Sequence, residues 1–195
     1  MPKKLFKKKT ITEKDVAKYS VIGDGSDGIV YQISSKKCVK LFFKEETCKL
    51  ELRGLKAGKS SLALPKLYEY GDNYIVSEYI EGISLARYLK RGYKIDEALT
   101  KKILFVLKEF QRIGFTRWDT DARHVLICEK TGGLKIVDHK RAFGKTRRMP
   151  IKLMNDLDKL GGVTDFLTHV KKLNPALYPD WSTYYKEQLQ PRNMS

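Results

Sequence analysis

Two aspartates flank a pair of short apolar segments in the middle of the chain, and this arrangement constrains the fold more than any other feature. Asp119 precedes the apolar residues 125–127, and Asp138 follows the apolar residues 134–137. The β-branched and apolar content of both segments is typical of strands, and Gly132 and Gly133 between them indicate a hairpin turn. Because a hairpin brings its two open ends together, we expect the carboxylates of Asp119 and Asp138 to lie in one neighbourhood.

His124 belongs to the same neighbourhood, because it immediately precedes the first strand, five residues after Asp119. An aspartate, a metal-binding side chain five residues later and a second aspartate beyond the hairpin resemble the catalytic loop and metal-binding motif of protein kinases. In that pattern the first aspartate orients the acceptor hydroxyl, and the other two side chains hold divalent cations against the nucleotide phosphates. The resemblance implies a catalytic role for Asp119 and metal-binding roles for Asp138 and His124.

Three glycines near the N-terminus, Gly23, Gly25 and Gly28, have the spacing G-x-G-x-x-G between two strand-like segments. Glycines let backbone amides approach phosphates without interference from a Cβ atom. The spacing alone also fits a dinucleotide-binding helix or an ordinary hairpin turn. Because residues 29–31 after the last glycine are strand-like and not helical, we favour the β-hairpin that covers the nucleotide phosphates in kinases.

Lys40 lies among apolar neighbours on a predicted strand, about ten residues after the glycines. It resembles the lysine that holds the α and β phosphates of ATP in kinases. Residues 45–56, which follow, carry apolar side chains at the i, i+4, i+7 spacing of an amphipathic helix. We predict that Glu51 on this helix pairs with Lys40. Glu45 and Glu46 are alternatives nearer the helix start, where a carboxylate complements the helix dipole.

The next segments extend the predicted sheet and then leave it. Residues 66–70 and 74–80 are strand-like and flank a glycine-containing turn, which predicts a second hairpin. Under the kinase interpretation, the backbone of Glu78 and Ile80 binds the adenine edge. The chain leaves the sheet near Gly82, where we place the boundary between two lobes.

The second half of the chain is predominantly helical. Asp96 caps a long amphipathic helix that ends at Gly114. Only about fifty residues follow Asp138, so the long activation segment and large helical lobe of a regulated protein kinase do not fit. The remaining predicted helices cover residues 151–160, residues 163–173 and a stretch near 181–189.

Taken together, the motifs fall in kinase order over about residues 19–143: Gly23, Gly25, Gly28, Val30, Lys40, Glu51, the hinge at Glu78 and Ile80, Asp119 and Asp138. The chain resembles a small atypical bacterial member of the eukaryotic-like protein kinase superfamily. Within it, the chain is most similar to the lipopolysaccharide core (Kdo/heptose) kinases and the compact RIO-type kinases. The lipopolysaccharide kinases share a histidine at the position of His124 and a His-Arg-Ala-like sequence after the metal-binding aspartate, here within residues 138–142.

This resemblance implies a two-lobed α+β protein-kinase-like fold. A basic segment, residues 1–18, would precede an N-lobe of residues 19–82 with a five-stranded antiparallel sheet plus one helix. Residues 83–195 would form a shortened, mainly helical C-lobe.

The chain also departs from the usual kinase motifs. Arg117-Trp118 replaces the His-Arg before the catalytic aspartate, His124 replaces an asparagine, and His139-Lys140 replaces the Phe-Gly after Asp138. A neutral imidazole is a poorer ligand for Mg²⁺ than an oxygen is, whereas Mn²⁺ accepts it more readily. His124 therefore either binds metal or orients Asp119 or a phosphate.

Composition limits the remaining function classes. The formal net charge of +16 over 195 residues favours phosphates, acidic polymers or anionic lipid as partners. Nucleic-acid binding is possible but not favoured, because no aromatic-interleaved basic motif appears. The three cysteines are widely spaced, which argues against a disulfide framework or a zinc site. With no apolar run long enough for a membrane span, we expect a cytoplasmic protein.

The sequence thus predicts ATP-dependent transfer of a phosphoryl group to a hydroxyl, with Mg²⁺ or Mn²⁺ as cofactor. The acceptor is a protein Ser/Thr side chain or a sugar as in the lipopolysaccharide kinases, and is possibly anionic, given the basic run after Asp138. The alternative is a catalytically weak or inactive pseudokinase that serves as a nucleotide-responsive or nucleic-acid-associated binding protein.

Overall fold

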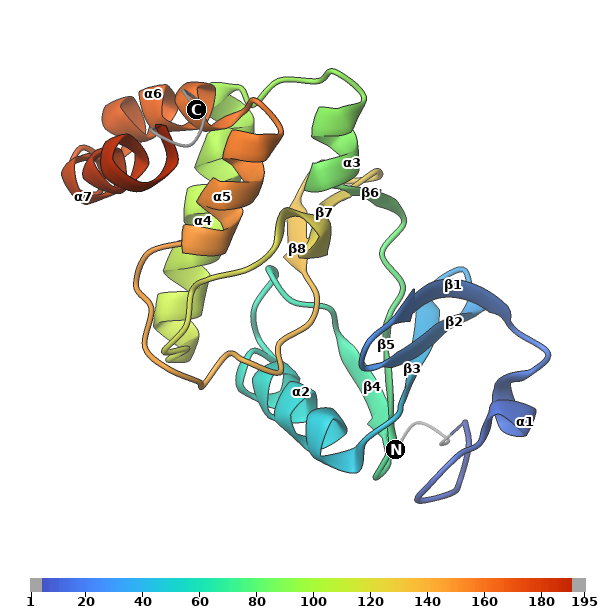
Figure 1. Ribbon diagram of the computed structural model, residues 1–195. Coiled ribbons are helices and arrows are strands. Elements are labelled where there is room, and N and C mark those ends of the chain that lie inside the picture. Colours follow the sequence, from blue (N-terminus) through green and yellow to red (C-terminus); the bar gives the residue numbers. More distant parts are fainter. Residues whose placement is uncertain (1–4, 191–195) are drawn as a thin grey trace. The chain divides into compact units, whose positions relative to one another are not determined.

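The computed structural model describes residues 5–190, and the chain divides into two compact units. The first unit consists of the chain up to Glu81 together with Ile136–Gly144, and the second consists of Gly82–Lys135 together with the chain from Lys145 onward. Each unit is built from its own segments, and both are drawn in Figure 1.

The first unit contains the predicted five-stranded antiparallel sheet. Its order is β1-β2-β3-β5-β4, so the two strands that flank the glycines, β1 and β2, form one edge. The predicted helix is α2 (Glu45–Ala57), which lies against β3, β4 and β5 with its apolar stripe of Cys48, Leu52 and Leu55 buried. The strands are β1 (Ser20–Gly25), β2 (Gly28–Ser34), β3 (Lys37–Phe42), β4 (Leu67–Tyr70) and β5 (Tyr74–Glu78).

The segment before β1 packs on this sheet. Ile11 and Val16 are buried in one apolar cluster with Tyr31, Val39 and Tyr74 of the strands, among others. The short helix α1 (Glu13–Val16) lies in this segment. Its start is stabilised by a capping contact, because the Asp15 carboxylate accepts a hydrogen bond from the Thr12 N–H at 2.9 Å.

Polar contacts hold the same segment at the turn between β4 and β5. The carboxylate of the buried Glu69 accepts hydrogen bonds from the backbone N–H groups of Leu5 and Phe6. The Asp72 N–H donates to the Lys9 carbonyl at 2.6 Å. At Gly71 a Cβ atom would lie 2.2 Å from that carbonyl, so only glycine lets the segment pass this closely. Of the basic run 1–9, residues 1–4 lie outside the described part.

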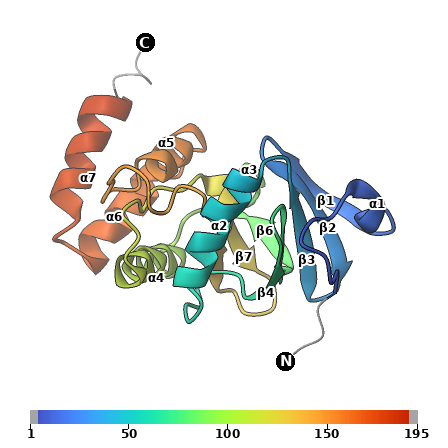
Figure 2. The same cartoon turned by 90° about the horizontal axis from the view of Figure 1, so that it is seen from below.

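The second unit is mainly helical, as predicted. Its long helix α4 (Glu97–Ile113) begins at Asp96, whose carboxylate accepts a hydrogen bond from the Leu99 N–H at 2.7 Å. Gly114 ends the helix in the left-handed conformation at φ +84°, which favours glycine. Figures 1 and 2 show α4 beside α6. The other helical elements are α3 (Leu85–Lys90), the 3₁₀ turn η1 (Ala122–His124), α5 (Ile151–Lys159), α6 (Val163–Leu173), α7 (Tyr178–Tyr184) and a π-helical turn, η2 (Tyr185–Leu189).

A three-stranded sheet of order β6-β7-β8 carries the predicted central hairpin. Its strands β7 (Val125–Cys128) and β8 (Leu134–Ile136) flank the predicted glycine turn, where the Gly132 N–H donates to the Cys128 carbonyl at 2.7 Å. The third strand, β6 (Gly82–Ser84), was not expected from the sequence and pairs with β7 in antiparallel fashion. At Gly82 a Cβ atom would lie 2.0 Å from the Ile127 carbonyl, which explains the glycine at this position. Among the described residues, no helix is long and apolar enough to cross a membrane.

Candidate functional site

The glycine-rich segment forms a tight β-hairpin in the first unit. Gly25 pairs with Gly28, and Ser26 and Asp27 form the turn between them. A Cβ atom on Gly28 would lie 2.1 Å from the carbonyl oxygen of Leu41 on β3. Gly28 is therefore required for packing of the hairpin on β3, a role that the spacing of the three glycines alone does not reveal.

Lys40 and Glu51 form the predicted pair. The Lys40 ammonium on β3 lies 2.8 Å from Glu51 Oε2, and the two side chains are 20% and 9% exposed. Burial raises the pKa of Glu51, an effect that the positive charge of Lys40 opposes. Lys40 also pairs with Val30 in the register between β2 and β3, so the ammonium group belongs to the strand next to the glycine-rich hairpin.

Asp138 lies in the same unit and has an unusual backbone conformation. Its φ of +64° falls in the left-handed region, which costs a non-glycine residue free energy and is often found at functional sites. Its negative charge contributes to the raised pKa of Glu51, so the two carboxylates share one electrostatic environment with Lys40. The negative charge of the predicted metal-binding aspartate therefore acts on the carboxylate that pairs with the predicted phosphate-binding lysine.

The residue after Asp138 explains how this position is held. His139 is buried, and its Nε2 lies 2.8 Å from the carbonyl oxygen of Ile136. A Cβ atom at Gly54 on α2 would lie 2.5 Å from the His139 Cβ, so the helix that carries Glu51 packs directly on this residue. His139, which replaces the usual phenylalanine, thus fixes the segment around Asp138 against α2.

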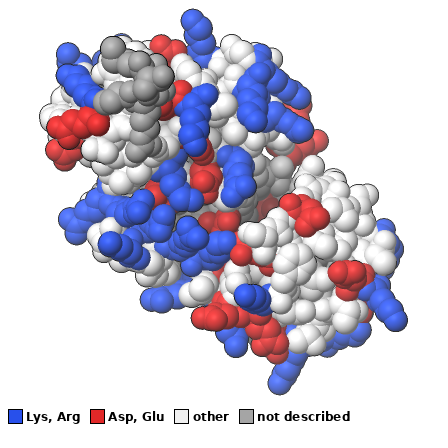
Figure 3. All heavy atoms as spheres, in the orientation of Figure 1, with Lys and Arg blue, Asp and Glu red and all other residues white. Residues whose placement is uncertain are grey.

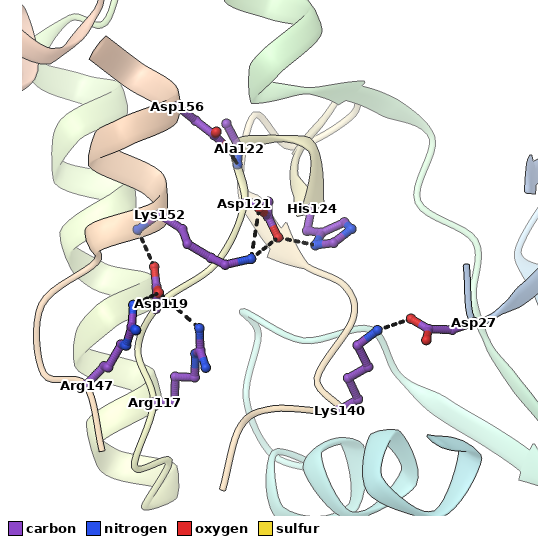
Figure 4. A network of polar contacts seen from close by, with 10 residues as sticks. All are labelled: Asp27, Arg117, Asp119, Asp121, Ala122, His124, Lys140, Arg147, Lys152 and Asp156. Atoms are coloured by element: carbon purple, nitrogen blue, oxygen red, sulfur yellow. Dashed lines mark hydrogen bonds and ion pairs between the residues drawn. The ribbon is translucent and has the colours of Figure 1, made fainter. Parts of the chain in front are cut away.

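Asp27, at the tip of the glycine-rich turn, forms an ion pair with Lys140 (Figure 4). Burial by itself would raise the pKa of Asp27. The hydrogen bond and charge of Lys140, followed by the charges of Lys40 and Arg141, outweigh burial and lower the pKa. The turn is therefore connected to the segment that follows Asp138, a contact that the sequence analysis did not anticipate.

The predicted adenine-binding segment follows the end of β5. Cys38 on β3 faces it, with its Sγ 3.6 Å from the Glu78 carbonyl oxygen and 3.6 Å from Ser77 Oγ. Burial raises the pKa of the Cys38 thiol. The Tyr79 N–H donates to the Lys36 carbonyl at 3.0 Å, which ties the segment before Ile80 to the turn that precedes β3.

In the second unit, the Asp119 carboxylate is fully buried and surrounded by donors (Figure 4). It accepts a hydrogen bond from the Lys152 backbone N–H at 2.5 Å. The guanidinium groups of Arg117 and Arg147 each lie 3.3 Å from its Oδ2. Arg147 and Lys152 belong to the segment before and at the start of α5, so this segment covers Asp119.

Asp121 lies two residues further on and is more accessible, with 25% of its side chain exposed. The Lys152 ammonium lies 3.2 Å from both of its carboxylate oxygens, and His124 Nδ1 lies 3.5 Å from Oδ2. Burial opposes ionisation of Asp121, but Lys152 and, to a smaller extent, His124 and Arg123 lower its pKa. His124 therefore lies beside Asp121, a partner that the sequence analysis did not consider.

The loop that contains these residues is anchored by α5. The Asp156 carboxylate accepts a hydrogen bond from the Ala122 N–H at 2.8 Å. At the other end of the loop, the Trp118 N–H donates to the Arg147 carbonyl at 2.9 Å. Asp156 lies on α5, and no motif given by the sequence indicates this contact.

The structure thus groups the predicted residues into two sets. The first unit contains the glycines, Lys40, Glu51 and Asp138, and the second contains Asp119 and His124. The expectation that Asp138 lies near Asp119 and His124 stays a prediction. Among the described residues, no group of three or more His, Cys, Asp or Glu side chains is arranged to hold a metal ion by itself. The carboxylate of Asp138 nevertheless supplies the hard oxygen ligand that Mg²⁺ prefers.

Comparison with known proteins identifies related sequences and structures. No family model matches the chain. A curated protein of Bacillus subtilis (strain 168), "Putative serine/threonine-protein kinase YrzF", is 28% identical over 133 residues, which cover 66% of this chain and 61% of that protein. The solved structure of the Cydia pomonella granulovirus kinase PK-1 matches with a TM-score of 0.51 and 18% identity, covering 65% of this chain and 55% of that one.

These similarities confirm the predicted fold class, a mixed α+β fold of the protein-kinase type. They also support a place in the protein-kinase-like superfamily. The matched part spans about three fifths of the Bacillus protein and just over half of the viral kinase. A closer relation to the lipopolysaccharide or RIO-type kinases stays a prediction.

Proposed function

We propose that this protein is an ATP-dependent phosphotransferase of the protein-kinase fold that transfers the γ-phosphoryl group to a hydroxyl. The observation that carries the proposal is the ion pair, at 2.8 Å, between Lys40 on the strand next to the glycine-rich hairpin and the buried Glu51 on α2. An amine paired in this way presents a fixed positive charge to phosphates, and Asp138 in the same unit supplies a metal-binding carboxylate.

On the nucleotide side, Lys40 would bind the α and β phosphates, and Glu51 would hold the ammonium group in place. The hairpin that contains Gly23, Gly25, Gly28 and Val30 would cover the phosphates, and the backbone of Glu78 and Ile80 would bind the adenine edge. Asp138 would bind Mg²⁺ or Mn²⁺, with His124 as the proposed second ligand. When bound, the metal ion would neutralise charge on the β and γ phosphates.

On the acceptor side, Asp119 is the proposed catalytic carboxylate. It would orient the acceptor hydroxyl and take its proton as the acceptor oxygen bonds to the γ-phosphorus and the bond to ADP breaks. Its carboxylate is fully buried, so a hydroxyl reaches it only if the segment with Arg147 and Lys152 withdraws. Asp121 is the second candidate for this role, because its carboxylate is already partly exposed.

The acceptor is proposed to be a protein Ser/Thr side chain or a sugar hydroxyl close to anionic groups. Between Lys140 and Lys152 the chain carries six basic residues and no acidic one. Figure 3 shows Lys and Arg side chains gathered over part of the visible surface, with acidic side chains interspersed. Such a cationic run attracts phosphate groups on an acceptor and raises the rate of encounter.

The alternative function is a weak or inactive pseudokinase that binds nucleotide or nucleic acid. The enclosure of Asp119 by three donors favours this alternative, since an acceptor hydroxyl must compete with them. A nucleic-acid function predicts affinity that falls steeply with salt and is unaffected by Asp119→Asn or Asp138→Asn. A phosphotransferase predicts strong dependence of activity on both aspartates.

The first test of the proposal is the effect of nucleotide on the melting temperature. A ligand that binds only the folded chain stabilises it by about 2.7 kcal/mol at one hundred times its Kd, which corresponds to a shift of several degrees. We expect this shift with ATP and Mg²⁺ or Mn²⁺, and we expect Lys40→Ala to abolish most of it.

Lys37→Ala is the matched control, because Lys37 lies on the same strand with its side chain exposed. Its nucleotide-dependent shift should equal that of the unaltered protein. Unchanged melting of the unaltered protein at millimolar ATP with either metal would argue against nucleotide binding and hence against the proposal.

A further inference from the structure

We propose that Asp27 is a built-in competitor of the nucleotide phosphates and that Lys140 is a phosphate-binding residue. In this proposal, Lys140 exchanges its ion pair with Asp27 for a nucleotide phosphate when nucleotide binds. The inference rests on the proposed nucleotide site, and it adds a residue and a regulatory contact that the kinase motifs do not contain.

Several positive charges act on the carboxylate of Asp27. Its carboxylate pairs directly with Lys140 and is also stabilised by the charges of Lys40 and Arg141. Lys40 is the proposed phosphate-binding lysine, so Asp27 and the phosphates would be attracted by the same cation. A carboxylate in this position stabilises the cations in the way that a phosphate oxygen would.

The backbone around the ion pair is fixed, while both side chains can rotate. The Asp27 carbonyl accepts a hydrogen bond from the Phe43 N–H at 3.0 Å, which holds the turn to the end of β3. Lys140 follows His139, which is buried against Gly54 of α2. The exchange of partners therefore requires only side-chain rotation, and the long flexible stem of a lysine allows it.

Electrostatics determines the direction of the effect. A triphosphate that approaches the glycine-rich turn meets the negative charge of Asp27, and like charges at short range repel. Both members of the pair are about one fifth exposed, so the pair is partly screened by solvent and can be displaced. Removing the charge of Asp27 should therefore strengthen nucleotide binding, and removing the charge of Lys140 should weaken it.

The test is a calorimetric titration of the whole chain with ATP and Mg²⁺, ADP and Mg²⁺, and adenosine. We expect Asp27→Asn to lower the Kd for ATP roughly tenfold, which corresponds to about 1.4 kcal/mol. The same change should affect ADP less and adenosine hardly at all, because adenosine has no phosphate. Lys140→Met should raise the Kd for ATP by a similar factor.

Glu13→Gln is the control for charge, because Glu13 lies on α1 in the same unit with its side chain exposed and outside the glycine-rich hairpin. It should leave the Kd for ATP within about twofold. The double variant Asp27→Asn/Lys140→Met should bind ATP more tightly than Lys140→Met and more weakly than Asp27→Asn, because it lacks both the repulsion by Asp27 and the contact with Lys140.

The outcomes separate this inference from the proposed function. If the unaltered protein binds ATP and Asp27→Asn leaves its Kd unchanged or raises it, the ion pair only fastens the turn and the inference is wrong. If Lys140→Met does not weaken ATP binding, the role of Lys140 is wrong. If neither the unaltered protein nor Asp27→Asn binds ATP, both the inference and the proposed function are overturned.

Discussion

Asp119 and Asp121 are separated by a single residue, yet their carboxylates have different environments. Asp119 is fully buried among the Lys152 backbone N–H and two guanidinium groups. The Asp121 side chain is 25% exposed, and its carboxylate contacts both the Lys152 ammonium and His124 Nδ1. The first carboxylate is thus part of the interior of its unit, whereas the second faces solvent and is kept ionised by its partners.

This contrast gives a prediction for the two carboxylates. We expect Asp119→Asn to reduce phosphoryl transfer by about 10²- to 10⁴-fold while the Kd for ATP changes little, because the proposed contact is to the acceptor. The same variant should also be less stable by about 3–5 kcal/mol, since the largely buried guanidinium group of Arg117 loses its anion. Transfer and urea unfolding measured on the same preparations would separate the two effects.

Asp121→Asn should leave the free energy of unfolding nearly unchanged, because its carboxylate is partly exposed. Asp180→Asn, an exposed position at the start of α7, is the control for loss of a carboxylate in the same unit. If Asp119→Asn is folded and fully active while Asp121→Asn is inactive, the catalytic role belongs to Asp121.

At the level of elements, the segment before β1 is part of the first unit's core. From the sequence, residues 1–18 are expected to form a basic segment, because lysines dominate its start. In the structure Ile11 is 2% exposed and packs with residues from the strands, while Glu69 accepts hydrogen bonds from the backbone of the same segment. The segment therefore contributes to the stability of the sheet that carries Lys40.

We predict that Ile11→Ala lowers the free energy of unfolding by about 2–5 kcal/mol, the range for truncation of a buried aliphatic side chain. Leu5→Ala is the control, because Leu5 is 49% exposed and should change stability by less than about 0.5 kcal/mol. Chemical denaturation measures both values. Equal stability of Ile11→Ala and the unaltered chain would show that the segment is dispensable for the fold.

Local patterns predicted the elements well, because each depends on residues close in sequence. The helix from Asp96 to Gly114 and the strands around Gly132 were found from capping, periodicity and turn signals. The pairing of Lys40 with Glu51 was also predicted, with Glu45 and Glu46 as alternatives nearer the helix start.

Contacts between distant segments were not predictable in the same way. Nothing near Asp27 in sequence indicates that Lys140 is its partner, and the separation of 113 residues hides the contact. The enclosure of Asp119 by Arg147 and Lys152 likewise joins residues that are far apart in sequence, because the segment before and at the start of α5 packs on Asp119. The role of Gly54 likewise follows only from its contact with His139.

At the level of the whole molecule, both the positive charge and the kinase-like fold support the proposed phosphotransferase function. The formal net charge of +16 attracts anions in general, but the ion pair of Lys40 with the buried Glu51 and the left-handed Asp138 are specific features that nonspecific attraction does not require. We therefore propose that the surface charge serves encounter with anionic partners and that the proposed site residues of the two units carry the chemistry.

The measurement that tests this account most directly is the rate of ADP formation from ATP, with Mg²⁺ or Mn²⁺ and a panel of protein and sugar acceptors. We predict that the unaltered protein forms ADP and that Asp138→Asn slows this by at least about 100-fold, because the proposed metal-binding carboxylate is lost. Glu13→Gln should retain the full rate, since Glu13 is exposed on α1 and outside the glycine-rich hairpin. An unaltered protein that forms ADP no faster than Asp138→Asn, with both metals and every acceptor, would contradict the assignment as a phosphotransferase.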